Sequence, residues 1–171
     1  MVRTEAIAAN SPRTFSMAEH SGINGRAAIM VRSKTSGKKV MVERAMYWDA
    51  GTGEACHDSI GMDSPHKTFY LPDGESSNGY ETWTLVQNPN SSDVTVEVTY
   101  MTPTGQGNVT KTETVKGSSR RTFSMAGHSG IQGRAAIMVR SKTSGKKVMV
   151  ERAMYWNSRG AGTDTIGGYS D

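Results

Sequence analysis

Apolar and polar positions alternate along much of this chain with a period of two residues. The clearest case is 93–101, where Val94, Val96, Val98 and Tyr100 alternate with polar residues and a final methionine. This alternation places the two sets of side chains on opposite faces of a β-strand. Similar short segments, separated by turn-forming residues, predict further strands and an antiparallel sheet structure. The predicted strands of this part of the chain are 68–71, 80–86, 93–101 and 109–115.

One stretch of this pattern occurs twice. Residues 13–49 and 121–157 match with an offset of 121 − 13 = 108, and they differ only at Glu19/Gly127, Asn24/Gln132 and Asp49/Asn157. After a two-residue gap, Ser59-Ile60-Gly61 matches Thr165-Ile166-Gly167. A fixed period of this length predicts tandem modules. We call 1–65 the first copy, 66–120 the front half and 121–171 the second copy.

This arrangement predicts one complete module, 66–171, preceded by 1–65, the back half of another module with its linker. The chain is therefore expected to be a piece of a longer array. In the first copy the pattern predicts short strands at 4–7, 13–17, 27–32 and 39–48, a glycine-rich loop around His20, and a connection over 49–65. Helix is an alternative for 26–32, because a short apolar run does not distinguish the two.

Composition supports a β-rich fold. Ser, Thr and Gly are plentiful, and the only leucines are Leu71 and Leu85. These preferences favour strands over helices. The predicted fold class is all-β: an antiparallel immunoglobulin-like β-sandwich, with one complete module plus the back half of a preceding module.

Charge and composition exclude several classes of protein. The net charge of +4 is mild for a nucleic-acid binder, so no nucleic-acid partner is predicted. The single cysteine, Cys56, excludes an intramolecular disulfide. No apolar run is long enough to span a membrane, and no signal peptide is visible.

The residues offer little catalytic chemistry. His20 and His128 are adjacent to Ser21 and Ser129, but nucleophilic catalysis needs a base that is oriented by a third group. We interpret both as loop histidines. Cys56 and His57 are adjacent without a second ligand pair, which is not a usual metal-binding spacing. The chain is predicted to be non-enzymatic, with no metal or cofactor.

Charged residues interrupt the apolar strand near the end of each copy. Glu43-Arg44 and Glu151-Arg152 are adjacent, so their side chains point to opposite faces and cannot pair within the dipeptide. Each is predicted to form a structural charge pair elsewhere, since a buried unpaired charge is costly. The candidate partners are Arg13/Arg121 or Arg26/Arg134 for the glutamates, and Glu97 or Glu113 for Arg152.

Other side chains form a possible interaction surface. Its basic members are Arg32, Lys34, Lys38, Lys39, Arg140, Lys142, Lys146 and Lys147. They either contact acidic glycans or the cell envelope, or protect an edge strand from association. Trp48, Trp83 and Trp156 either stack on sugars or belong to the core. Asn90 and Asn108 begin two N-x-Ser/Thr sequons, which are possible glycosylation sites at turns.

The order of motifs resembles a known family. The segments GYETWTLVQNPN, SSRRTFSM, VMVERAMYW and IGG are similar to a tandem-repeat surface domain of unknown function in large secreted or envelope-attached bacterial and archaeal proteins. The resemblance covers 68–167 in full and 4–61 as the back half. It implies a spacer, stalk or adhesive role, an extracellular or cell-surface location, and no assigned catalytic residues.

The two back halves share only one front half. The first copy alone would leave bare sheet edges and an uncovered apolar face. We therefore expect association with other copies of the repeat, by strand exchange or end-to-end packing, in a homo-oligomer or filament. The alternative function is a carbohydrate-binding or adhesive module with surface glycans as partners.

Overall fold

The computed structural model describes residues 1–171, which divide into two compact units, Met1–Met30 and Val31–Asp171. The first unit contains one short helix, α1 (Met17–Ser21), and no strand. α1 ends at Gly22, whose left-handed backbone (φ 71°) lets its N–H donate to the Ala18 carbonyl. The predicted strands at 4–7 and 13–17 are therefore wrong, and α1 includes His20 and Ser21 at the start of the predicted loop.

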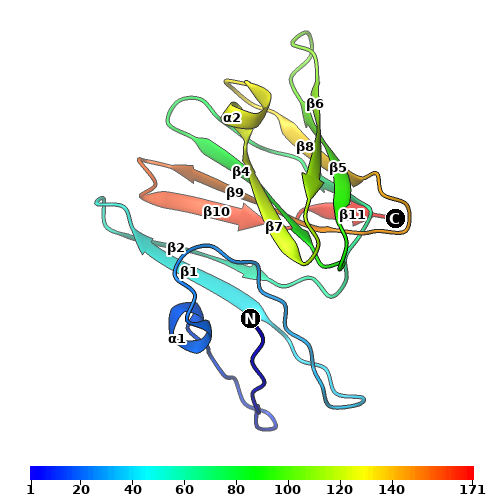
Figure 1. The fold of residues 1–171 in the computed structure, drawn as a ribbon. Coiled ribbons are helices and arrows are strands. Elements are labelled where there is room, and N and C mark those ends of the chain that lie inside the picture. The colour runs from blue at the N-terminus through cyan, green and yellow to red at the C-terminus, as the bar shows by residue number, and fades with distance from the viewer. The chain divides into compact units, whose positions relative to one another are not determined.

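The second unit is an antiparallel β-sandwich (Figure 1), which confirms the predicted all-β class. One sheet has the order β10-β9-β4-β7, with bounds Ala161–Thr165, Met149–Trp156, Glu81–Asn88 and Ser119–Ser124. The other has the order β11-β3-β8-β5-β6, with bounds Gly168–Ser170, Thr68–Leu71, Ala136–Ser141, Val94–Met101 and Val109–Val115. A short helix, α2 (Met125–Ser129), follows β7. No helix of the chain has the length and apolar character needed to cross a membrane.

The core lies between the two sheets. Val94, Val96, Val98 and Tyr100 of β5 are fully buried, as their alternation predicts. The other core residues come from both sheets and include Phe69, Val86, Phe123, Ile137, Val139 and Val148. Burial of this apolar surface is the main source of the stability of the sandwich.

Asn88 organises the turn after β4. Its side chain is buried and its Nδ2 donates to three backbone carbonyls, those of Ser92, Val115 and Lys116, at 2.9 to 3.1 Å. This network satisfies backbone groups that the turn leaves without strand partners. The Asn-Pro-Asn motif therefore has a structural role in the front half.

The two copies of the repeat adopt different structures. In the second copy, β8 is hydrogen-bonded to both β3 and β5 of the front half. The matching segment 28–33 has no strand, so the predictions of strand or helix near it are wrong. Val139 and Val148 are fully buried, whereas their counterparts Val31 and Val40 are 50% and 44% exposed. The front half supplies the neighbours that the local sequence lacks.

A separate two-stranded hairpin precedes the sandwich. It consists of β1 (Glu43–Asp49) and β2 (Glu54–Ile60). β2 falls within 49–65, which was predicted to be a connection, so that prediction is wrong. Trp48 pairs with Ala55 in this hairpin as Trp156 pairs with Ala161 in β9–β10, so the two hairpins share one register.

Candidate assembly site

The hairpin β1–β2 packs on strand β10 of the four-stranded sheet, on the face that points away from the core (Figure 1). Arg44, Met46 and Trp48 of β1 are half-buried, and His57 of β2 is buried. The residues between them on each strand are exposed. The hairpin therefore has a donor face, defined by Arg44, Met46, Trp48 and His57, that covers the outer face of β9–β10.

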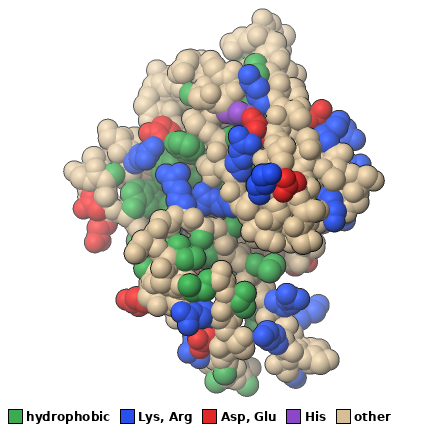
Figure 2. All heavy atoms as spheres, viewed as in Figure 1, with side chains coloured by type: hydrophobic (Ala, Val, Ile, Leu, Met, Phe, Trp, Pro, Cys, Tyr) green, Lys and Arg blue, Asp and Glu red, His purple; other side chains and the backbone are tan.

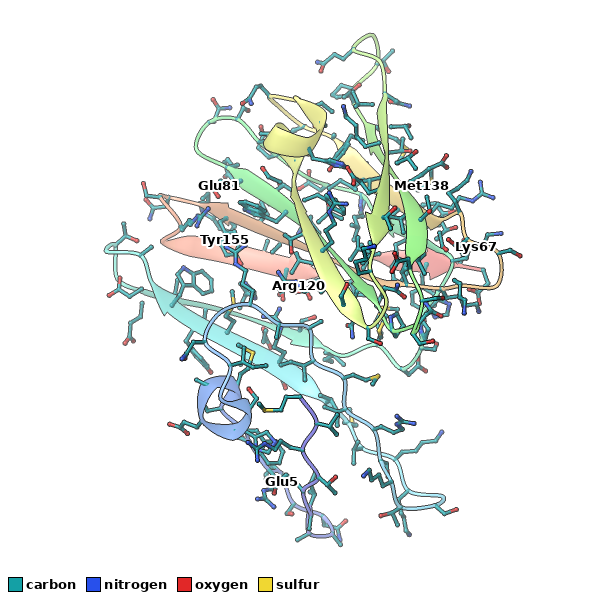
Figure 3. All side chains as sticks on the ribbon, in the orientation of Figure 1. Glu5, Lys67, Glu81, Arg120, Met138 and Tyr155 are labelled. Carbon is teal, nitrogen blue, oxygen red and sulfur yellow. The ribbon has the colours of Figure 1, made fainter.

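Strand alternation explains which residues of β9 and β10 receive the hairpin. Val150 and Arg152 point into the sandwich, so Glu151, Ala153 and Tyr155 point outward. Asp164 of β10 pairs with Ala153 and shares this outer face. We call Glu151, Ala153, Tyr155 and Asp164 the acceptor face. Tyr155, labelled in Figure 3, belongs to the second copy, and the hairpin drawn below it in this view belongs to the first.

An ion-pair cluster joins the two faces. Arg44 Nη2 lies 2.6 Å from Glu151 Oε1 and also contacts Asp164 Oδ2. The side chain of Asp164 is only 1% exposed, so its charge needs this partner. A guanidinium group can pair with two carboxylates at once because its donors lie in one plane. Arg44 thus neutralises an acidic pair that the second copy leaves on its outer surface.

Aromatic side chains surround this cluster. His57 Nε2 lies 3.2 Å from the Tyr155 hydroxyl, and His57 Nδ1 lies 3.1 Å from Asp164 Oδ2. The ring of Trp48 packs edge-on against Tyr155, with 5.6 Å between the ring centroids. Its indole N–H donates to the Arg159 carbonyl at 2.6 Å. These contacts fix the register of the hairpin on the acceptor face.

The environment shifts the pKa values of two residues in the cluster. Burial, together with a hydrogen bond to Asp164, raises the pKa of Glu151 to about 7, although the Arg44 charge opposes this shift. Burial also lowers the pKa of His57, against the attraction of Asp164. In both cases the dominant cause is the loss of water around the charged form. Docking of the hairpin is therefore coupled to protonation.

A second polar cluster lies within the sandwich. The Tyr100 hydroxyl lies 2.8 Å from His128 Nδ1, and His128 Nε2 lies 3.2 Å from Glu113, which also pairs with Arg121. Burial raises the pKa of Tyr100 and lowers the pKa of His128. The buried tyrosine therefore keeps its proton. His128 connects its hydroxyl to a surface ion pair.

The first unit contains the matching residues of this cluster, apart from the tyrosine. Arg13 pairs with Glu5 at 2.9 Å, and His20 Nδ1 lies 3.8 Å from the same carboxylate. His20 packs on Phe15 with 4.5 Å between centroids, the same separation as between His128 and Phe123. Glu5, Arg13, Phe15 and His20 thus form the equivalent cluster in a unit that has no β-sheet. The counterpart of Tyr100 would come from a front half.

Of the predicted charge pairs, Arg44 and Glu151 do form ion pairs, but the predicted partners are wrong. Glu151 pairs with Arg44 rather than with Arg121 or Arg134. Arg152 is buried and donates to the Asp73 carbonyl at 3.0 Å, rather than pairing with Glu97 or Glu113. Glu43 is exposed on the outer side of the hairpin. The predictions considered partners within one module, whereas Arg44 of the first copy pairs with Glu151 of the second.

The predicted interaction surface does not form one patch. Lys142 pairs with Glu97 at 3.0 Å and Lys147 pairs with Asp171 at 2.7 Å. β8, which carries Arg140, lies inside its sheet, so the edge-strand interpretation is wrong for the second copy. The remaining basic residues of the surface are exposed (Arg32, Lys34, Lys38 and Lys39), apart from the half-buried Lys146.

The three tryptophans are half-buried and none belongs to the core, so the core interpretation is wrong. Trp48 contributes to the assembly site. The guanidinium carbon of Arg159 lies 5.9 Å from the centroid of the Trp83 ring. Trp156 stacks on Tyr80, with 5.8 Å between the ring centroids. The last two tryptophans place aromatic rings at the surface of the second unit.

The two sequons differ in their environment. Asn90 is half-buried, and its Nδ2 donates to Asn88 Oδ1 at 2.7 Å and to the Lys147 carbonyl at 2.8 Å. A glycan on this nitrogen would break both bonds. Asn108 is exposed in the β5–β6 turn. Of the two predicted glycosylation sites, only Asn108 has a side chain open to modification.

Several residues of the assembly site were not identified from the sequence. His57, Tyr155 and Asp164 were not singled out as partners. One signal was present in the sequence, because His57 stands where the second copy has Thr163. No group of three or more His, Cys, Asp or Glu side chains is arranged to hold a metal ion.

Comparisons with known proteins concern the fold alone. No protein-family model matches the sequence, and no curated protein matches it. The chain is similar to the crystal structure of Thermotoga maritima 1070, with 14% sequence identity and a TM-score of 0.54. This similarity covers 64% of this chain and 97% of that one. It agrees with the antiparallel β-sandwich described above.

Proposed function

We propose that this chain is a non-enzymatic structural repeat module of an extracellular or cell-surface stalk or filament protein. The observation that carries the proposal is the docked hairpin. Its donor face comes from one copy of the repeat and its acceptor face from the next. Such a contact couples neighbouring modules in series, as repeat proteins require.

The exposed residues of the first copy support association with other copies. Val31, Val40 and Met41 of the second unit are 50%, 44% and 93% exposed. The space-filling view in Figure 2 shows hydrophobic side chains that reach the surface among Lys and Arg residues. In the second copy the same valines form core, covered by the front half. A front half or another copy of the repeat is therefore the partner that fits this surface.

Light scattering over a concentration series tests this proposal. We expect the mean mass to rise above the monomer mass of 18.5 kDa as concentration increases. We also expect negative-stain images to show end-to-end or swapped assemblies. The control variant Val31→Ser/Val40→Ser removes apolar surface outside the folded core and should shift the chain toward monomer. A constant monomer mass in both proteins would contradict the proposal.

A carbohydrate-binding or adhesive module is the second candidate, favoured by the aromatic rings of Trp83, Trp156 and Tyr80. Glu81 and Arg159, joined at 2.6 Å, provide polar groups beside Trp83. Rings with neighbouring polar groups suit sugar recognition. Calorimetric titration with acidic and neutral oligosaccharides tests this candidate. Binding that Trp83→Ala abolishes would support it.

A further inference from the structure

Two glycines beside the acceptor face lie close to the hairpin, Gly160 in the turn before β10 and Gly162 in β10. A Cβ atom at Gly162 would lie 2.7 Å from Tyr155 Cδ1 and 3.2 Å from Trp48 Cη2. A Cβ atom at Gly160 would collide with the Thr52 side chain, in the turn between β1 and β2. The contact at Gly160 is closer than packed atoms tolerate, and at Gly162 both the Tyr155 ring and the Trp48 ring of the hairpin would have to shift. A side chain at either position therefore opposes docking of the hairpin.

The first copy has side chains at both matching positions. Because Ala55 matches Ala161 in the shared register, Glu54 stands at the position of Gly160 and Cys56 at that of Gly162. The other residues of the face are the same: Glu43, Ala45, Tyr47 and Asp58 match Glu151, Ala153, Tyr155 and Asp164. The outer face of β1–β2 thus carries the same acidic pair but lacks the glycines.

We infer that Gly160 and Gly162 make the outer face of β9–β10 an acceptor for the hairpin of another repeat copy, and that Glu54 and Cys56 close the same face of β1–β2. The partner is a hairpin with the strand pattern Arg-x-Met-x-Trp, as in Arg44, Met46 and Trp48. Arg44 recognises the acidic pair, and the Trp48 ring occupies space that is free because Gly162 has no Cβ atom.

This inference rests on the proposed coupling of repeats. It also states which copy provides the donor hairpin and which provides the acceptor face. A copy with Gly-x-Gly in its last hairpin can receive on that face the hairpin of the copy that precedes it. A copy with Glu-x-Cys cannot, so docking stops after one step. Acidic charge alone does not define the acceptor, because both hairpins have it.

Hydrogen exchange measured by mass spectrometry on the whole chain tests the assignment. In Gly162→Ala we expect the β1 and β2 amides to exchange at least about tenfold faster than in the wild type, because an undocked two-stranded hairpin is marginally stable. Protection in β5 and β8 should stay unchanged. Gly168→Ala is the matched control, since a Cβ there meets nothing within 4 Å.

A gain-of-binding experiment completes the test. A synthetic peptide of residues 39–60 is titrated into the wild type and into Glu54→Gly/Cys56→Gly. We expect at least about tenfold tighter binding to the variant, lost when the peptide carries Arg44→Ala. Equal binding to both chains would overturn the inference.

The exchange experiment separates two failures. If β1 and β2 are unprotected already in the wild type, the hairpin is not docked and the proposed coupling of repeats fails. If they are equally protected in the wild type and in Gly162→Ala, docking stands and the role of the glycines is overturned.

Discussion

Single residues decide how the two copies meet. Arg44 and Arg152 have the same neighbours in sequence, but Arg152 donates to Asp73 of its own module and Arg44 pairs with Glu151 and Asp164 of the next copy. The difference arises because the first copy has no counterpart of Asp73. An arginine that would otherwise be buried within a module becomes the contact between copies.

The pH dependence of docking follows from two residues with opposite effects. The docked state raises the pKa of Glu151 to about 7, so this residue favours docking at low pH and opposes it as the pH rises from its usual value of 4.5 toward 7. The docked state lowers the pKa of His57, so this residue favours docking above its usual value of 6.5 and opposes it as the pH falls.

Paired variants separate these effects. In His57→Thr, which introduces the second copy's residue, docking should weaken as the pH rises from about 4.5 to 7. In Glu151→Gln, docking should weaken as the pH falls below about 6.5. The Trp48 indole N–H resonance reports docking, because this group donates to the Arg159 carbonyl only when the hairpin is docked. Identical pH profiles of the two variants would contradict the assignment.

The exposed sequon gives a second prediction at this scale. If the chain is produced in a host that glycosylates N-x-Ser/Thr sites, Asn108 should be modified and Asn90 should not. Asn108→Gln should remove the added mass, whereas Asn90→Gln should leave it. Peptide mapping by mass spectrometry measures both. Modification at Asn90 in the folded chain would contradict the two hydrogen bonds of its amide.

At the scale of elements, identical sequence does not produce identical structure. Residues 136–141 form β8 because β3 and β5 are adjacent on either side. The same apolar run in the first copy lacks these neighbours and forms no strand. Strand formation depends on cross-strand partners more than on local preference.

This dependence explains what could be predicted from the sequence. The sequence pattern predicts the strands of the front half, because each of these has its partners in the chain, but it does not predict β10 and β11 of the second copy. The predictions at 4–7, 13–17 and 27–32 failed because they carried that pattern into the first copy. The contact of Arg44 with Glu151 could not be predicted, because it depends on which face of the hairpin packs on the sheet.

The cluster around Tyr100 gives an element-scale prediction. Tyr100→Phe removes the hydrogen bond between β5 and His128 of α2 and leaves the rest of the core in place. We expect a loss of about 1 kcal/mol in the free energy of unfolding, measured by urea denaturation. Tyr47→Phe is the matched control, since Tyr47 is 78% exposed. Equal effects of the two substitutions would contradict a specific role for this bond.

On the scale of the whole molecule, the central claim is that one copy of the repeat is coupled to the next. The core of the sandwich contains no residue of the hairpin. The hairpin therefore packs on the acceptor face as a contact between copies and does not form part of the module's core. In a longer array the same contact would set the spacing of modules. The strength of this coupling is therefore the quantity on which the account depends.

A double-mutant cycle of Arg44→Met and Glu151→Gln measures that coupling, with the docked fraction followed by the Trp48 indole resonance during urea titration. We predict a coupling energy of about 1 to 3 kcal/mol, because the pair is partly buried and Arg44 also contacts Asp164. The single variant Arg44→Met should weaken docking, since it leaves two carboxylates without their cation. A coupling energy indistinguishable from zero would contradict the claim that this contact joins the copies.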